Sequence, residues 1–140
     1  MKTSTKMRNA DLVANASRLL AFATRRGKTM NISQLLLAAL SRQPKMHYID
    51  FDTASRKLHA IERRGLEAVV RTPLAQQQWA ELRDQVAEAM STRRRLSFVQ
   101  ALTFVLHFRR PSRFYIAPNS AFKILNRHFR PSLVEVVCRP

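Results

Sequence analysis

The chain has 140 residues, of which 46% are hydrophobic, which is enough for a core and argues against wholesale disorder. Its two glycines exclude a glycine-rich phosphate loop, and its single cysteine, Cys138, excludes an internal disulfide. Twenty-five Lys and Arg oppose nine Asp and Glu, and the resulting net charge of +16 indicates a polyanionic partner, of which nucleic acid is the commonest.

The charge is also compatible with a basic surface that binds nothing and with attraction to an anionic membrane surface. No apolar run approaches the roughly 18 residues that span a bilayer, so we expect no membrane partner and a cytoplasmic location, nucleoid-associated if the ligand is DNA. Residues 1–28 are amphipathic and nearly free of acid, which is typical of a mitochondrial transit peptide. Their counterpart in the second half, described below, predicts that they belong to the fold.

The first half of the chain predicts two helices followed by a strand. An amphipathic helix has apolar residues at three- and four-residue spacing over 12–23. After a basic turn, a second helix over about 31–42 is apolar nearly all round, so we expect it to be buried. Pro44 ends this helix, and the aromatic and β-branched "MHYID" at 46–50 predicts a short strand.

A third helix and a second strand complete the unit. Asp52 and Thr53 offer N-caps to the helix, which we expect to bury Ala54, Leu58 and Ile61. "LEAVV" at 66–70 predicts the closing strand.

The second half repeats this order. Shifted by 67 residues, 44–73 matches 111–140 at ten positions, where chance gives about two. This half again predicts a first and a second helix and two strands, "RFYIA" and "LVEVV". Its third helix is expected to bury Ala121, Leu125 and Phe129. The expected fold is therefore mainly α with short strands (α+β). It consists of two tandem helix-helix-strand-helix-strand units, 1–73 (with a short N-terminal tail) and 74–140, related by a pseudo-two-fold axis and sharing one core.

Basic residues gather at equivalent places in the two copies, which predicts that both touch the same polyanion. The clusters lie after the first helices, beside the second copy's first strand, and along the third helices. Their members are Arg25, Arg26, Lys28, Arg93, Arg94, Arg95, Arg109, Arg110, Arg113, Arg56, Arg63, Arg64, Lys123, Arg127 and Arg130.

"TASRKLHAIERRGL", residues 53–66, resembles the recognition helix of winged helix-turn-helix DNA-binding domains, with its Thr-Ala-Ser-Arg start and a Gly-Leu ending that leads into the wing. The resemblance implies that this helix enters the major groove. It implies base contacts from Thr53, Ser55 and Arg56, and backbone contacts from Lys57, Arg63 and Arg64.

Signals for other chemistry are weak. The four histidines, His47, His59, His107 and His128, have no metal-ligand spacing to Cys, Asp or Glu, so we expect neither a metal nor a cofactor. No base-activated nucleophile is visible, so we expect a protein that is not an enzyme and has no small-molecule substrate. We expect Phe98, Phe104 and Phe108 in the core. Tyr48, Phe114 and Tyr115 suit core packing better than stacking on unpaired bases.

These observations favour a non-enzymatic protein whose two basic third helices grip duplex DNA, in the manner of a regulator or accessory factor of a mobile or viral element. An RNA-binding subunit of a ribonucleoprotein complex is the alternative. A helical adaptor that docks on a protein partner is the third hypothesis.

Overall fold

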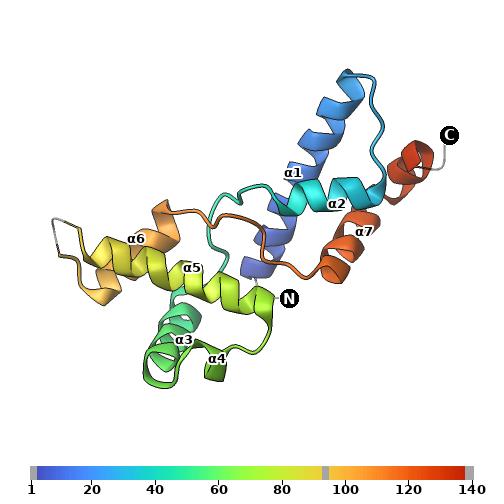
Figure 1. Ribbon diagram of the computed structural model, residues 1–140. Coiled ribbons are helices and arrows are strands. Elements are labelled where there is room, and N and C mark those ends of the chain that lie inside the picture. The colour runs from blue at the N-terminus through green and yellow to red at the C-terminus, as the bar shows by residue number, and fades with distance from the viewer. Residues whose placement is uncertain (1–2, 93–94, 138–140) are drawn as a thin grey trace. The chain divides into compact units, whose positions relative to one another are not determined.

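The computed structural model describes residues 3–92 and 95–137, with the side chains of 3–92 and 95–129. Helices make up 73% of it, and no strand occurs in this part of the chain. The chain forms two compact units (Figure 1). Unit 1 consists of Met1–Pro44 and Ser112–Pro140, and unit 2 of the continuous segment Lys45–Pro111.

Unit 1 contains three helices, α1 (Thr3–Arg25), α2 (Ile32–Leu40) and α7 (Pro118–Val137), each of which packs on the other two. The segment before α7 joins them, because the Phe114 N–H donates to the Leu40 carbonyl oxygen at 3.1 Å. The buried cluster draws on all these segments and comprises Leu12, Ala16, Leu35, Ala39, Leu40, Phe114, Ile116, Ala121, Leu125 and Phe129.

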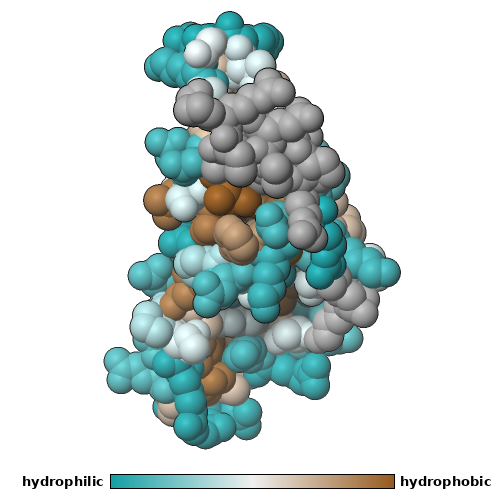
Figure 2. Space-filling view, turned by 90° about the vertical axis from the view of Figure 1, so that its right-hand side faces the viewer, coloured by the Kyte–Doolittle hydropathy of each residue, from teal (hydrophilic) through white to brown (hydrophobic). Residues whose placement is uncertain are grey.

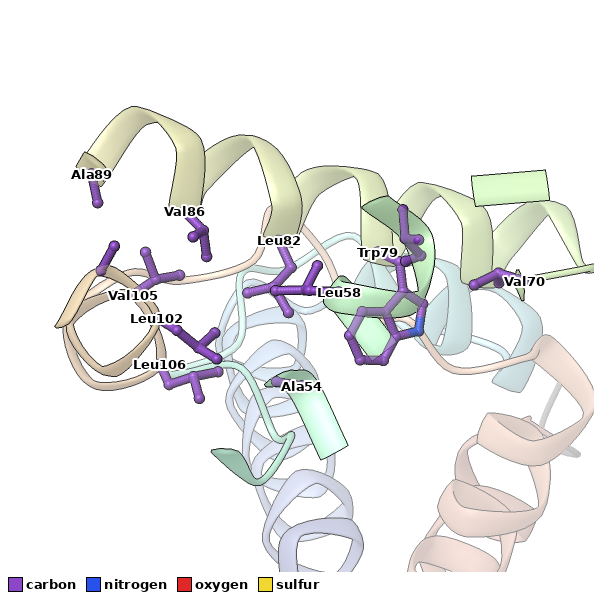
Figure 3. Close-up of a cluster of buried hydrophobic side chains, with 12 residues drawn as sticks. Ala54, Leu58, Val70, Trp79, Leu82, Val86, Ala89, Leu102, Val105 and Leu106 are labelled. Carbon is purple, nitrogen blue, oxygen red and sulfur yellow. The ribbon is translucent and has the colours of Figure 1, made fainter. Parts of the chain in front are cut away.

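Unit 2 contains α3 (Phe51–Arg64), α4 (Leu66–Val69), α5 (Pro73–Met90) and α6 (Phe98–Phe108). In its core, α5 points Trp79, Leu82 and Val86 at the apolar faces of α6 and α3 (Figure 3). Leu102, Val105 and Leu106 of α6 and Ala54, Leu58 and Ile61 of α3 are buried against them.

The second helices of the two copies begin with the same device. In α2, Asn31 and Gln34 form a capping box, each side chain accepting from the other residue's backbone N–H; Ser97 and Gln100 do the same in α6. Such a cap contributes about 1 kcal/mol to helix stability because it satisfies backbone donors that the helix leaves unpaired.

The basic turns after the first helices also match. The N–H of Gly27 donates to Thr24 O and that of Arg95 to Thr92 O, both at 3.0 Å. Both residues have positive φ, 70° for Gly27 and 45° for Arg95. A residue with positive φ therefore follows the first helix in both copies, glycine in one and arginine in the other.

The α+β prediction was wrong, because the expected strands are absent from the described residues. "MHYID" and "RFYIA" carry no regular secondary structure, and no second segment pairs with either. "LEAVV" forms the short helix α4, and "LVEVV" continues α7. Aromatic and β-branched residues favour a pleated surface only where a neighbouring strand and a packed face exist, and here their side chains dock onto helices.

Other details of the prediction also need correction. Asp50, and not Asp52 or Thr53, caps α3, because its Oδ1 accepts from the Thr53 N–H at 2.8 Å. α6 is not buried all round, since Phe104 and Phe108 are 42% and 73% exposed. The expected buried faces of the third helices are confirmed, as the exposed fraction of Ala54, Leu58, Ile61, Ala121, Leu125 and Phe129 does not exceed 8%.

The compact units cut across the two predicted copies. The third helix of the first copy, α3, packs in unit 2 with α6, which belongs to the second copy. The third helix of the second copy, α7, packs in unit 1 with α1 and α2 of the first copy. The boundaries 1–73 and 74–140 thus describe similarity along the sequence, whereas each unit combines helices of both copies around its own buried cluster.

Candidate nucleic-acid interface

Each unit takes its third helix from the other sequence copy, an arrangement that we call the exchange. The net charge is divided unequally between the two units. Unit 1 contains thirteen Lys and Arg and two acidic residues, a net charge of +11, whereas unit 2 contains twelve and seven, a net charge of +5. One of the two acids of unit 1, Asp11, is buried, and its Oδ1 accepts from Asn15 Nδ2 at 2.9 Å. The surface of unit 1 is therefore the more strongly cationic.

The end of α1 carries the first predicted cluster. Arg25, Arg26 and Lys28 are all exposed. The turn that presents them is fixed by two backbone bonds, from Gly27 N to Thr24 O at 3.0 Å and from Lys28 N to Ala23 O at 2.9 Å. This pattern closes the last helical turn and directs the chain away from the axis of α1.

Three residues outside the sequence-predicted clusters join this one in space. Arg18 and Phe22 precede it on the same helix at four-residue spacing, and Arg42 follows α2. One open hollow of about 390 Å³ is lined by Arg18, Phe22, Arg25 and Arg42, together with Leu19 and Ala21. We call the exposed set Arg18, Phe22, Arg25, Arg26, Lys28 and Arg42 the α1 basic face.

Signals for the missed residues existed. The four-residue spacings from Arg18 to Phe22 and from Phe22 to Arg26 place all three on one side of α1. Arg42 pairs with Arg109 under the same 67-residue shift that revealed the repeat.

No carboxylate forms an ion pair with the cations of the α1 basic face among the described side chains. By contrast, unit 2 contains ion pairs between Arg109 and Glu88 (3.5 Å) and between Arg83 and Asp84 (3.7 Å).

Figure 2 shows one side of the molecule, where hydrophilic side chains cover most of the drawn surface and hydrophobic patches lie between them.

The residues of α3 that the family resemblance assigns to base contact have local partners. Thr53 Oγ1 donates to Asp50 Oδ2 at 2.9 Å. Ser55 Oγ lies 3.5 Å from His59 Nδ1, which in turn donates to the Ser55 carbonyl oxygen at 2.8 Å. No strand follows α3 in the described chain, where the family carries its wing. The resemblance stays a prediction based on fourteen residues.

The cationic side chains of α3 differ in their exposure to solvent. Arg56, Arg63 and Arg64 are exposed. Lys57 is half-buried, with Nζ 5.3 Å from the centre of the Trp79 ring, and such cation–π contact holds it against the protein.

The remaining predicted residues divide between the units. In unit 1, Lys123 and Arg127 are exposed on α7, while Arg113 lies over the Tyr115 ring at 5.7 Å. The side chain of Arg130 lies outside the described part, as do Arg93 and Arg94. In unit 2, Arg95 and Arg110 are exposed and Arg109 is half-buried.

Unit 2 also contains a buried histidine. His47 is 2% exposed, and its Nε2 lies 2.6 Å from Gln85 Oε1. Burial lowers the pKa of His47 below its usual value, an effect that the Gln85 hydrogen bond and the charge of Glu81 oppose and the charge of Arg109 reinforces. A buried, structurally bonded imidazole of this kind suits packing better than proton transfer to a ligand.

Other kinds of site find no support in the described residues. They contain no group of three or more His, Cys, Asp or Glu placed to hold a metal ion. None of the helices described is both long and apolar enough to cross a membrane. No family model, no curated protein and no solved structure matches this chain.

Proposed function

We propose that this protein binds nucleic acid through the α1 basic face. The observation that carries the proposal is the gathering of five exposed cations from the second half of α1, the turn after it and the segment after α2, with no carboxylate of the described side chains paired to them. Four of the five are arginines, which bind phosphate oxygens through two N–H groups at once. Exposed arginines without acidic partners repel one another and gain most when a polyphosphate replaces their counterions.

Unit 2 is the weaker candidate for the main contact. Its α3 carries exposed Asp52 and Glu62 on the same helix as Arg56, Arg63 and Arg64, and these acids reduce the attraction for phosphate. Grip on duplex DNA by both third helices therefore has less support than contact through unit 1.

The test compares two triple variants of the full chain that lose the same charge. Arg25→Ala/Arg26→Ala/Lys28→Ala removes three exposed cations from the α1 basic face, and Arg56→Ala/Arg63→Ala/Arg64→Ala removes three from α3. Binding to duplex DNA, hairpin RNA and single strands is measured from about 50 to 300 mM salt. Circular dichroism checks that both variants stay folded.

We expect the first variant to lose at least about tenfold in affinity, with a salt slope that is shallower by about 0.7 to 0.9 for each phosphate that it no longer neutralises. The α3 variant should lose less than about threefold. Equal losses in the two variants would show that only net charge matters and would contradict a localised site.

A helical adaptor is the second candidate, because α6 exposes a pair of neighbouring phenylalanines. Phe104 and Phe108 are exposed with ring centres 5.3 Å apart. A flat salt dependence with every nucleic acid would favour this function over the first. In that case Phe104→Ser/Phe108→Ser is the variant that should abolish binding to the protein partner.

A further inference from the structure

Phe22 is the member of the α1 basic face that phosphate binding leaves unexplained. Its side chain is 50% exposed, and it belongs to neither buried cluster. A single exposed apolar side chain is common on protein surfaces, so what distinguishes Phe22 is its position among the arginines of the α1 basic face.

The ring of Phe22 is a wall shared by two hollows. The first, of about 390 Å³, is the one lined by Arg18, Arg25 and Arg42. The second, of about 430 Å³, is lined by Arg26 and Lys28 and by polar residues, Thr29 and Gln34. Both volumes fall in the range of roughly 300 to 1,000 Å³ that is usual for small-ligand sites.

A guanidinium group already stacks on this ring. The Cζ atom of Arg26 lies 4.6 Å from the centre of Phe22, and Arg26 lines the second hollow but not the first. Phe22 therefore also borders a hollow that Arg26 does not line, and the cations lining that hollow are Arg18, Arg25 and Arg42. An aromatic ring flanked by arginines is the combination on which unpaired bases stack while their phosphates are held.

We infer that an unpaired nucleobase stacks on Phe22 in the first hollow, so that the preferred ligand is single-stranded nucleic acid. This inference rests on the proposed function and narrows it. A base inside a duplex is already stacked on both faces and cannot reach the ring, so Phe22 adds affinity for a single strand and none for a duplex. The five cations, in contrast, attract the phosphates of either.

The experiment uses the full chain with three variants. Phe22→Ala removes the ring, Phe22→Tyr keeps an aromatic ring, and Phe122→Ala removes another exposed phenylalanine of unit 1 that lines neither hollow. The probes are a single strand of about 20 nucleotides with one 2-aminopurine base, and the matching duplex. Thermal unfolding checks that each variant retains the wild-type melting temperature.

We expect Phe22→Ala to weaken binding to the single strand by about 5- to 150-fold and to leave duplex binding within about twofold. The wild-type protein should quench 2-aminopurine fluorescence, Phe22→Tyr should do the same, and Phe22→Ala should not. Phe122→Ala should behave as wild type in every assay.

The inference and the proposed function fail differently. If Phe22→Ala binds both probes as tightly as wild type, or loses affinity for both equally, base stacking is overturned. The proposed function would still be supported in that case if binding depends on salt and the triple variant of Arg25, Arg26 and Lys28 reduces it. If neither probe binds the wild-type protein at low salt, both proposals fall.

Discussion

His47 is a residue whose hydrogen bond fixes where its proton lies. Gln85 Nε2 donates to the Arg110 carbonyl oxygen at 3.0 Å, so its Oε1 faces His47 and must accept. The neutral imidazole therefore carries its hydrogen on Nε2. Through this chain of bonds the segments before α3 and after α6 are both held to α5.

The buried imidazole predicts a pH-dependent stability. Its pKa is lowered in the folded state, so as the pH falls below 6.5, the ordinary value, the unfolded chain takes up the proton first. The stabilisation is complete above pH 6.5 and is lost as the pH falls toward the folded-state pKa. Urea unfolding between about pH 5 and 8 measures the effect.

His47→Phe should flatten this pH dependence, since Phe114 fills the matching position of the other copy and is buried there. The control, His107→Asn, changes an exposed histidine and should leave the wild-type slope intact. A wild-type slope in His47→Phe would show that other groups cause the loss.

The sequence indicates the candidate site most clearly where its cations are close together along the chain. Arg25, Arg26 and Lys28 stand out as a run in the sequence. Arg42 lies on another segment, and only packing of α2 on α1 brings it to Arg18. Phe22 resembles any apolar residue of an amphipathic helix until the structure shows that it is half exposed.

At the scale of the element, the basic turns after the first helices show how one conformation tolerates two residue types. Glycine has no Cβ and adopts positive φ without cost, whereas an L-residue loses roughly 1 to 2 kcal/mol there. Arg95 accepts this strain at φ 45°. A Cβ added at Gly27 would meet no atom within 4 Å, so backbone strain is the only penalty at that position.

Opposite changes at these two positions should therefore have opposite effects. Arg95→Gly should stabilise the fold by up to about 1 kcal/mol, and Gly27→Ala should destabilise it by about 1 kcal/mol. Chemical denaturation of both variants gives the two signs. Destabilisation by Arg95→Gly would mean that contacts of the arginine side chain outweigh its backbone strain.

The helices were predictable and the strands were not, for a physical reason. Leu58 and Ala54 recur at helical spacing whatever their surroundings, and caps such as Asn31 and Ser97 act within three residues. A strand exists only if a partner supplies hydrogen bonds, and nothing local in Tyr48 or Ile49 reports that none pairs here.

At the scale of the whole molecule, the sequence could not say which copy packs on which. Ala54 and Leu58 of α3 correspond to Ala121 and Leu125 of α7, and all four are buried. The two third helices, α3 and α7, present nearly the same apolar face. Each could therefore pack on the first and second helices of its own copy or on those of the other copy. The connecting segments, 41–50 and 109–117, carry no periodic signal that would predict which arrangement forms.

Two fragments of equal length test the exchange. Residues 45–111 form unit 2 and contain its whole buried cluster, whereas residues 74–140 form one sequence copy and separate α7 from its partners. We expect 45–111 to be a monomer that unfolds cooperatively. We expect the 74–140 fragment to be unfolded as a monomer and to fold only when two or more copies associate. Analytical ultracentrifugation together with thermal melting measures both properties. A monomeric 74–140 as stable as 45–111 would contradict the exchange.

The discontinuous make-up of unit 1 sets an order of events on the ribosome. α1 and α2 are translated before unit 2, yet the buried partners that α7 supplies, up to Phe129, are translated about 85 residues after Pro44. At about 5 to 20 residues per second, the nascent α1 and α2 wait roughly 4 to 17 s, while residues 45–111 are already complete. The helices translated before unit 2 are thus enclosed only after it, and slow translation of residues 112–129 would prolong their exposure to chaperones and proteases.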